Sequence, residues 1–323
     1  MSLKLAPLPE ARPTPLPLWP QAWYIVGRST DLRRGSISSG RLAGRPYVLF
    51  RRHSGELAAL DAHCPHMGAH LQHGRVVGER LRCPLHHWQI DGEGRCWGTG
   101  AGADSRTRAW QVRERFGLIF LYLGAGPPPA LPAPARGEDY SWGSAPPIAL
   151  ETGWHAMMVN GFDLFHLGAV HGREVLGTPE LTAMERTLTL RYVSRVTGRG
   201  LSDRVMKFLS RDRIRVEQVC HGPTLAISTR LGNRRTSAVL GLRPTDTGVL
   251  AYGAFGVAEG APLLPLQRLV ARWLFTAFLR RDFQVVEKMR LKLDGVGDPG
   301  VRAIAGFLSS LPAVEETPRE AVS

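Results

Sequence analysis

Two closely spaced pairs of cysteine and histidine constrain the fold more than any other feature of the sequence. Cys64-Pro65-His66 is followed, after residues 67–82, by Cys83-Pro84-Leu85-His86. Two thiolates and two imidazoles can hold one zinc ion tetrahedrally, or a two-iron cluster in which two histidines replace two cysteines on one iron. Structural zinc sites favour Cys-x-x-Cys with His-x-x-x-His, whereas each pair here joins one sulfur donor to one nitrogen donor. The pattern therefore favours the two-iron cluster and leaves zinc as the alternative.

The pattern of apolar residues divides the chain into an all-β part and a mixed part. Apolar runs broken by glycine at residues 23–27, 47–50, 57–60 and 118–123 indicate strands. The proline-rich residues 126–137 indicate a linker. Beyond it, residues 154–171 and 266–293 have helical patterns, and residues 188–256 alternate like strands. We predict an α+β protein with an extension (1–20), an all-β domain (21–126), a linker (127–139) and a helix-plus-antiparallel-sheet domain (140–323).

Composition narrows the partners and the compartment. The net charge is +13, but the arginines are spread along the chain without a basic helix repeat or a zinc-finger spacing, so we expect no nucleic acid partner. Four cysteines make a disulfide framework unexpected. Because residues 1–20 are rich in proline and charged at Lys4, Glu10 and Arg12, we expect no signal peptide and a cytoplasmic protein.

The residues around the two pairs resemble a Rieske 2Fe-2S domain over about the first 125 positions. The resemblance rests on residues 64–69, 83–88 and 91–96, which read CPHMGA, CPLHHW and DGEGRC. It implies that Cys64 and Cys83 bind one iron and that His66 and His86 bind the other. His87 stands where many members have glycine, and we expect this change to be tolerated just outside the ligand set. The neighbouring His63, His70 and His73 are expected at the surface or around the ligands, and Cys96 and Cys220 are expected to be buried thiols.

A second candidate metal site follows in the sequence Asn160-Gly161-Phe162-Asp163-Leu164-Phe165-His166-Leu167-Gly168-Ala169-Val170-His171. Histidines in an apolar helix are more often satisfied core residues than ligands. On an ideal helix a step of five residues leaves His166 and His171 about 140° apart, so joint ligation needs a distortion, which Gly168 could permit. The Asp-x-x-His-x-x-x-x-His pattern resembles the iron-binding motif of Rieske oxygenase catalytic domains, in which two histidines and one carboxylate hold ferrous iron.

The carboxylate is predicted in the late helix. Asp282 lies three, four or seven residues from apolar positions, which places it on the buried face: Phe275, Phe278, Val285, Val286 and Met289. Glu287 has charged and polar neighbours at these spacings and fits a solvated helix position better. We therefore predict Asp282 as the third ligand, in agreement with the late helix that supplies it in the family.

The resemblance assigns two further roles. It implies that Asp163 links a cluster histidine of one subunit to an iron-ligating histidine of the next, and therefore a head-to-tail homotrimer. Asn160 matches a residue close to the iron that can tune it. The expected enzyme is a terminal oxygenase that uses O2, one 2Fe-2S cluster and one Fe(II) to hydroxylate, desaturate or dealkylate a substrate.

Electrons must come from outside the chain. No nucleotide-binding glycine motif follows a strand, and Cys96 and Cys220 cannot hold a second cluster, so NAD(P)H acts only through a separate reductase, with or without a ferredoxin. The motifs look most like the branch of ketosteroid hydroxylases and cholesterol desaturases, which implies a hydrophobic, polycyclic substrate. The apolar residues 263–279 fit either a pocket lining or a core helix. Two alternatives stay open: a Rieske electron-transfer protein without catalytic iron, and a zinc-dependent hydrolase at His166, His171 and Asp282.

Overall fold

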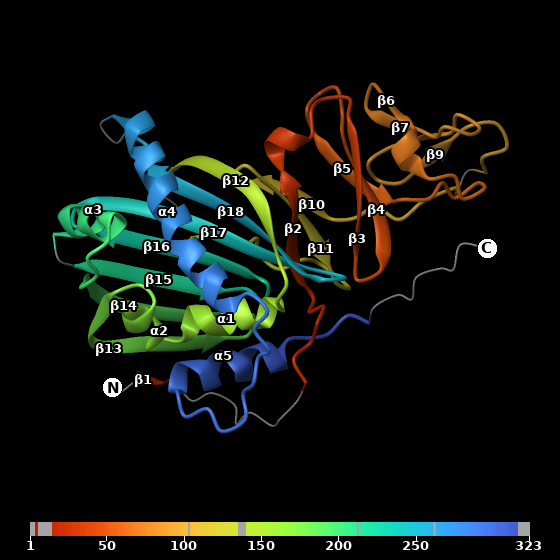
Figure 1. Cartoon of the computed structure of the whole chain (residues 1–323). Helices are drawn as coiled ribbons and strands as arrows, with labels where there is room; N and C mark the ends of the chain where they lie inside the picture. Colours follow the sequence, from red (N-terminus) through yellow and green to blue (C-terminus); the bar gives the residue numbers. More distant parts are fainter. Residues whose placement is uncertain are drawn as a thin grey trace. The chain divides into compact units, whose positions relative to one another are not determined.

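The structure is a computed structural model that describes residues 4–5, 15–102, 104–134, 140–211, 213–260 and 263–315. It divides into two compact units (Figure 1). The small unit is Ile25–Pro128, and the large unit combines the segment up to Tyr24 with Pro129–Ala313. The first is built of strands and the second of a large sheet with helices, which confirms the predicted α+β class.

The small unit contains three small antiparallel sheets. Their strand orders are β10-β11-β2, β3-β4-β5 and β6-β7-β8-β9. The strands are β2 (Ala22–Arg28), β3 (Ile37–Leu42), β4 (Arg45–Arg51), β5 (Leu57–Asp61), β6 (Arg75–Val77), β7 (Arg80–Arg82), β8 (Gln89–Ile90), β9 (Cys96–Trp97), β10 (Val112–Arg115) and β11 (Leu118–Leu123). The four apolar runs predicted as strands lie in β2, β4, β5 and β11. The two Cys/His pairs lie in the loops before β6 and β8, and the 3-10 turn η2 (Leu71–His73) follows the first pair. A second 3-10 turn, η1 (Ser29–Asp31), follows β2.

The large unit is built on one eight-stranded sheet in the order β1-β13-β14-β15-β16-β17-β18-β12. Its strands are β1 (Lys4–Leu5), β12 (Tyr140–Leu150), β13 (Arg173–Met184), β14 (Thr187–Val196), β15 (Ile214–Cys220), β16 (Thr224–Leu231), β17 (Arg234–Thr245) and β18 (Gly248–Ala258). The ladders from β13 to β12 are antiparallel, whereas β1 pairs with β13 in parallel. The predicted alternating region is β14 to β18, interrupted by an unpredicted helix, α3 (Leu201–Ser210).

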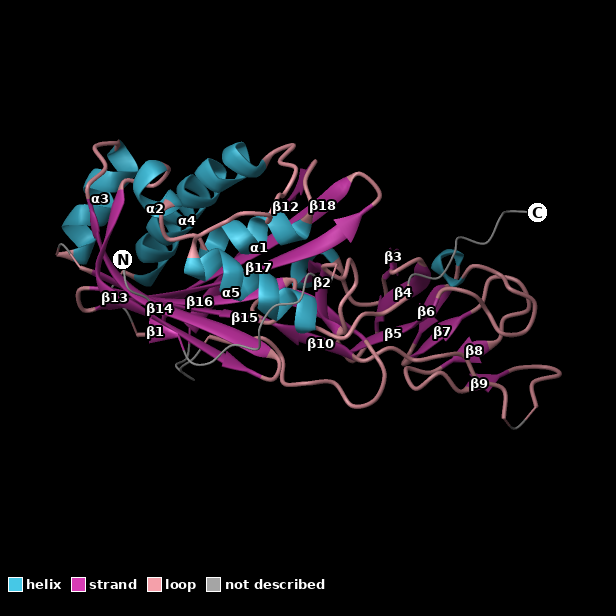
Figure 2. Cartoon of the chain, turned by 90° about the horizontal axis from the view of Figure 1, so that it is seen from below, coloured by secondary structure: helices cyan, strands magenta, loops and turns pink. Residues whose placement is uncertain are grey.

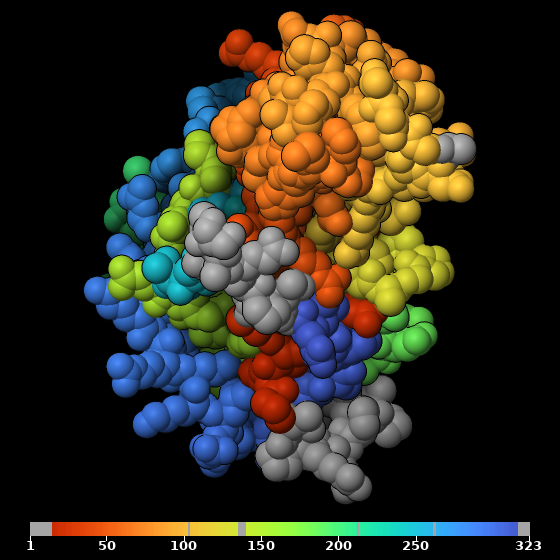
Figure 3. All heavy atoms as spheres, turned by 90° about the vertical axis from the view of Figure 1, so that its right-hand side faces the viewer, coloured from red at the N-terminus to blue at the C-terminus, as the bar shows by residue number. Residues whose placement is uncertain are grey.

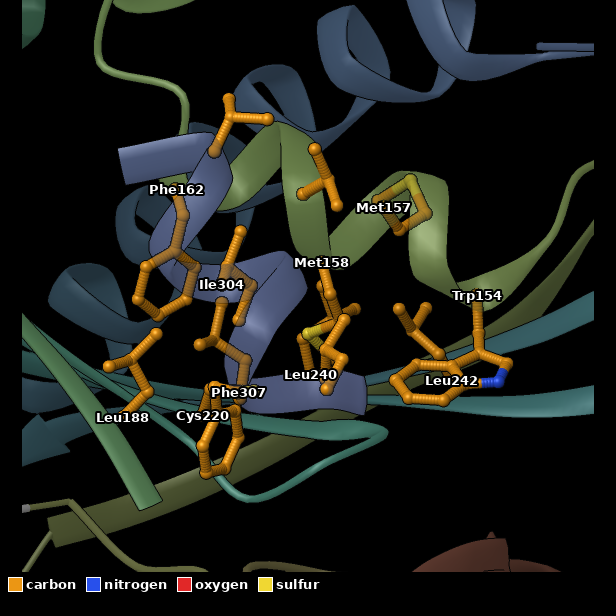
Figure 4. Packing of buried hydrophobic residues seen from close by; sticks show 14 of the residues in the cluster. Trp154, Met157, Met158, Phe162, Leu188, Cys220, Leu240, Leu242, Ile304 and Phe307 are labelled. Carbon is orange, nitrogen blue, oxygen red and sulfur yellow. The ribbon is translucent and has the colours of Figure 1, made fainter. Parts of the chain in front are cut away.

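The helices gather on one face of this sheet, as Figures 1 and 2 show. They are α1 (Trp154–Phe162), α2 (His166–Ala169), α4 (Leu264–Val286) and α5 (Pro299–Ser310), besides α3. The main core lies between α1, α5 and the sheet (Figure 4). Trp154, Met158 and Phe162 of α1 belong to the same buried cluster as Ile304 and Phe307 of α5, and Figure 4 shows Trp154 beside Leu242. None of the described helices is long and apolar enough to span a membrane.

The segment before the small unit belongs to the large one. The Gln21 amide donates to the Pro312 carbonyl at 2.8 Å, and the Trp154 indole donates to the Leu18 carbonyl at 3.0 Å. Further along, the Thr224 hydroxyl donates to the Trp23 carbonyl at 3.2 Å. In Figure 3 this red segment lies against the blue C-terminal part of the chain. The compact small unit therefore begins at Ile25, whereas the sequence placed the domain start at residue 21.

One buried histidine of the large unit makes stability depend on pH. His221 follows β15, its Nε2 is enclosed without a hydrogen-bond partner, and burial lowers the pKa of its imidazole to about 4. A lowered histidine pKa means that the unfolded chain binds the proton first, so stability is complete above about pH 6.5 and falls between about pH 6.5 and pH 4. Between pH 7 and pH 5 the loss should be about 2 kcal/mol in the free energy of unfolding.

The His221→Gln variant should lose this part of the acid sensitivity. Urea unfolding followed by tryptophan fluorescence at pH 7 and pH 5 measures it, with the exposed His53→Gln as the matched control. An equal pH dependence in the His221→Gln variant and the wild type would contradict the assignment.

Candidate metal centres

The first centre lies in two loops of the small unit that have the same backbone design. Each cysteine is followed four residues later by a residue at positive φ, Gly68 at 75° and His87 at 59°. The Cys64 amide donates to the Ala69 carbonyl at 2.9 Å, and the Cys83 amide donates to the Trp88 carbonyl at 2.8 Å. Both loops thus close tightly over their cysteine and leave the following residues turned outward.

These loops bury sulfur and expose nitrogen. Cys64 and Cys83 are 3% and 1% exposed, and the two thiols contact each other. Burial raises the pKa of the Cys64 thiol, amide hydrogen bonds from the following residues lower it, and Cys83 raises it again, with a net increase. The exposed imidazoles of His66 and His86 lie with ring centroids 4.6 Å apart. The four predicted ligands are therefore brought together as a buried sulfur pair and an outer nitrogen pair.

That arrangement fits a two-iron cluster. One iron needs thiolates and the other needs imidazoles, and the two donor types are already sorted to two sides of one small site. The Trp88 ring is stacked on His66 with centroids 4.5 Å apart and planes 7° apart, which restrains the imidazole. The donor set therefore fits the chemistry of this group.

His87 occupies a backbone position that favours glycine. Its φ of 59° lies in the left-handed region, where a side chain costs about 1 kcal/mol relative to glycine. The imidazole of His87 is exposed. The cost of a histidine at this position therefore comes from backbone strain and not from its closeness to the cluster ligands.

The remaining histidines and cysteines do not join either centre. His63, His70 and His73 form a surface cluster in which the rings of His63 and His70 are 5.1 Å apart. Cys96 and Cys220 are buried free thiols, and burial raises their pKa values to about 11 and about 12. This agrees with the structural role predicted for the two cysteines.

The second centre is formed where helix α1 breaks. The helix ends at Phe162, and the Oδ1 of Asp163 accepts the amides of Phe165 at 2.9 Å and His166 at 3.4 Å. These hydrogen bonds close the turn between α1 and the short helix α2, which begins at His166. The continuous helix predicted over residues 154–171 is therefore wrong, since the carboxylate of Asp163 replaces the helical hydrogen bonds of the next turn.

The exit from α2 is a second break. The chain turns at Gly172, with φ of 56°, where an added Cβ would lie 2.6 Å from the Cα of Gly198. Gly168, which the sequence suggested as the source of distortion, lies within α2 and has no such conformation. Helix α2 ends at Ala169, so His171 lies beyond it and the separation of about 140° on an ideal helix does not apply to the two histidines.

Asp282 of α4 meets the two histidines. Its Oδ1 lies 2.7 Å from the Nε2 of His171 and 3.4 Å from the Nε2 of His166. Within the described part of the chain, this is the one group of three such residues whose donor atoms all lie within 4.8 Å of one another. Asp282 is 6% exposed and His171 is fully buried. Glu287 is exposed and accepts the Glu151 amide at 3.1 Å, and it is not part of this group of three residues.

The electrostatics of the group are those of a tightly coupled cluster. Burial raises the pKa of Asp282, but the hydrogen bonds and charges of the two histidines outweigh it, so the net pKa is lowered. Burial lowers the pKa of His166, whereas Asp282 and the Asp163 carbonyl raise it, with a net increase. The Asn160 amide donates to the same Oδ1 of Asp282 at 2.9 Å. Asn160 thus helps to fix the carboxylate that faces the histidines.

The donor set fits a divalent metal. Two imidazoles and one carboxylate suit ferrous iron, and they also suit zinc. The Nδ1 of His166 contacts the Asp163 carbonyl, which orients the Nε2 toward the centre. The ring of His171 stacks on Phe278 with centroids 3.7 Å apart, and its buried Nδ1 has no hydrogen-bond partner. One imidazole is therefore oriented by a hydrogen bond and the other by packing.

A deep pocket opens beside these ligands. It has an empty volume of about 1280 Å³ including its mouth, and His166, Asn160 and Asp282 form part of its wall. Helix α4 contributes Leu274, Phe275, Phe278 and Leu279 to the lining, while its residues Leu266 and Leu269 are exposed. The apolar run predicted as either lining or core is thus partly lining and partly surface.

The pocket also contains polar residues that the sequence reading missed. Arg173, Tyr192, Ser194 and Gln218 lie on strands β13 to β15 and face the same space as Phe278 of α4. One feature of the sequence could have indicated a polar residue near the metal ligands, namely the charged Arg173 two residues after His171. The strand that begins at Arg173 was not predicted.

Comparison with known proteins agrees with the motifs. A model of the Rieske [2Fe-2S] domain matches residues 22–107. The oxygenase component of a 3-ketosteroid-9-alpha-monooxygenase from Rhodococcus rhodochrous is 31% identical over 167 residues, which are 47% of this chain and 43% of that protein. Cholesterol 7-desaturase nvd 1 from Ciona intestinalis is 30% identical over 165 residues, 48% of this chain and 35% of that protein. The matches thus span less than half the length of these relatives.

Solved structures extend the likeness in fold to most of the chain. The NdmA QL mutant of Pseudomonas putida CBB5 with theobromine has a TM-score of 0.66 at 17% identity and covers 93% of this chain and 97% of its own. Dicamba monooxygenase bound to dicamba has a TM-score of 0.63 at 20% identity and covers 90% and 97%.

The class follows from these findings: residues 22–107 match the Rieske [2Fe-2S] domain, and a unit of one large sheet with helices follows them. Within that class the chain resembles the ketosteroid monooxygenase and cholesterol desaturase branch, which confirms the resemblance seen in the motifs.

Proposed function

We propose that the chain is the terminal oxygenase of a multicomponent Rieske system and oxidises a hydrophobic organic substrate with O2 and external electrons. The observation that carries the proposal is the convergence of His166, His171 and Asp282 beside a pocket lined mainly by apolar residues, with His166 and Asp282 in its wall. A Rieske domain in the same chain supplies a route for single electrons. The relatives named as oxygenase components support a separate reductase as partner.

The chemistry is divided between two groups and the residues around them. A cluster held by Cys64, His66, Cys83 and His86 would relay single electrons, and Fe(II) held by His166, His171 and Asp282 would bind and activate O2. Asn160 holds the carboxylate in place through its amide, and the Asp163 carbonyl holds His166. The apolar wall excludes water and positions the carbon to be oxidised, so pocket shape decides among hydroxylation, desaturation and dealkylation.

Asp163 is proposed as the link between centres of neighbouring subunits in a homotrimer. Its Oδ1 is engaged by the amides of Phe165 and His166, and these are its carboxylate contacts within the described residues. The other oxygen remains available for a histidine of a second copy, since His66 and His86 are exposed. The exposed cluster histidines are also where a reductase or ferredoxin would deliver electrons.

Two other functions make different predictions for metal content. An electron-transfer protein would hold the cluster and no further iron, and a zinc hydrolase would be colourless. Electron paramagnetic resonance with iron and sulfide analysis on dithionite-reduced protein separates them. We expect a Rieske signal and one additional iron, which a His166→Ala, His171→Ala double variant loses. A signal without additional iron would favour the carrier, and no signal would favour zinc.

The cluster ligands can be tested against a cysteine of the same unit. Cys83→Ser should lose the visible colour and the paramagnetic signal, because a hydroxyl replaces a thiolate ligand. Cys96→Ser removes a buried thiol of similar exposure that lies outside the ligand set and should keep both. Absorption spectra and acid-labile sulfide of the two purified variants measure this. Equal cluster content in both would contradict the assignment.

A further inference from the structure

The pocket holds one arginine that the proposed chemistry does not use. Arg173 begins β13, is 7% exposed and lines the pocket. Within the described lining, Arg173 and Asp282 are the residues with permanently ionised groups at neutral pH, and Asp282 is engaged by the two histidines. A guanidinium in an otherwise mostly apolar cavity is costly unless an anion pairs with it.

The protein itself does not fully supply that anion. Asp203 of α3, 4% exposed, lies between Arg173 and Arg281. Arg281 takes both of its oxygens, at 3.3 Å and 3.1 Å, and adds contacts to Ser202 and to the His171 carbonyl. Arg173 makes a single contact with Asp203, through Nη1 at 3.4 Å. Two arginines thus share one carboxylate, and Arg173 has the weaker part of it.

The other donors of Arg173 are directed to open space. Its Nε and Nη2 have no hydrogen-bond partner among the described residues, and neither is enclosed by protein. Since Arg173 lines the pocket, these two nitrogens can reach a ligand there. Two adjacent N–H groups of a guanidinium match the two oxygens of a carboxylate.

Tyr192 adds a hydroxyl to the lining of the same pocket. It lies on β14, which pairs with β13, and its ring lines the cavity. Burial and the charge of Asp282 raise the pKa of the phenol, and the charge of Arg173 lowers it, with a net increase that keeps the phenol neutral. The neutral phenol can donate a hydrogen bond to an oxygen of a ligand in the pocket.

We propose that Arg173 and Tyr192 bind a carboxylate of the substrate, so that the substrate class is an apolar, ring-bearing acid and not a neutral hydrocarbon or ketone. The apolar body would lie against Leu274, Phe275 and Phe278 of α4. This inference rests on the proposed function, because the bound acid is a substrate only if the protein is an oxygenase. Binding of the acid by Arg173 and Tyr192 does not itself require oxidation.

Binding of two isosteric probes tests the site. 2-Naphthoate and 2-acetylnaphthalene share a ring system and differ in carboxylate against methyl ketone. Dissociation constants are measured by calorimetry on the metal-loaded full chain without oxygen. We expect the wild type to bind naphthoate at least 10-fold more tightly than the ketone. Arg173→Gln should lose at least 10-fold in naphthoate affinity and less than 3-fold in ketone affinity.

Two further variants keep the test decisive. Tyr192→Phe removes only the hydroxyl, is expected to fold normally, and should weaken naphthoate by 3-fold or more. Arg204→Gln removes an exposed arginine of α3 and should change neither constant. Absence of naphthoate binding to the wild type, or equal affinity for acid and ketone, overturns the proposal. If the additional iron is absent but the acid is still preferred, the oxygenase proposal fails and the carboxylate site stands.

Discussion

Asp282→Asn is expected to lose the additional iron and more than about 100-fold of product formation, while the Rieske signal stays intact. Loss of a group that only supports a ligand already lowers metal affinity or activity by about 10- to 100-fold, and Asp282 is placed as a ligand itself. The amide keeps the size of the side chain but removes the one negative charge that faces His166 and His171. Iron analysis and substrate turnover with a supplied reductase measure the two effects.

Glu287→Gln is the matched control for this experiment. It removes a carboxylate at the end of the same helix, but one that is exposed and accepts the Glu151 amide. Iron content and turnover should stay within about 2-fold of the wild type, as for a surface substitution. If Asp282→Asn behaves like Glu287→Gln, the third ligand has been assigned wrongly.

Asp163→Asn is expected to keep both metal centres and to lose about 100-fold or more in turnover. The asparagine oxygen can still accept the Phe165 and His166 amides, so the break between α1 and α2 is preserved. What disappears is the negative charge proposed to link His166 to a cluster histidine of a neighbouring subunit.

Rapid-mixing absorption spectroscopy locates the effect of this variant. The cluster should still be reduced by dithionite, but its reoxidation on mixing with oxygen and substrate should slow by the same factor as turnover. Glu174→Gln, in an exposed ion pair with Arg195, is the charge-matched control and should reoxidise normally. Reoxidation at the wild-type rate in Asp163→Asn would show that electrons do not pass through this residue.

The donors proposed for the first centre could be chosen from the sequence because they lie in one short stretch. The cysteines and histidines are brought together by two local loops, each closed by its own backbone hydrogen bonds. The second centre needed tertiary information. Periodicity identified the buried face of α4 and hence Asp282, but the break at Asp163 depends on hydrogen bonds to its side chain, and the turn at Gly172 depends on the close approach of Gly198.

The missed elements of the large unit have local causes. Strands β12 and β13 contain register shifts between Ala145 and Ile148 and between Leu176 and Glu180, which interrupt the alternation that indicates a strand. Helix α4 ends at Val286 instead of continuing to residue 293, because Lys288 takes a positive φ and its amide pairs with Glu151. The start of α5 did carry a signal, since Asp298 caps it before Pro299.

Arg173 was out of reach of the sequence for a different reason. A charged residue at the start of a strand is ordinarily solvated, and only the fold places it between a pocket and a carboxylate already shared with Arg281. Its strand was itself among the missed ones, so no face could be assigned to it.

The attachment of residues 15–24 to the large unit limits how the two units can be exchanged. A hybrid joined only at the proline-rich linker would take residues 15–24 and the small unit from one protein. The rest of its large unit, with Trp154 and Pro312, would come from the other protein. The Trp154 indole and the edge next to Pro312 would then face a foreign sequence. Modular recombination in this fold therefore requires two junctions, one near residue 25 and one near residue 128, so that the large unit keeps both of its own segments.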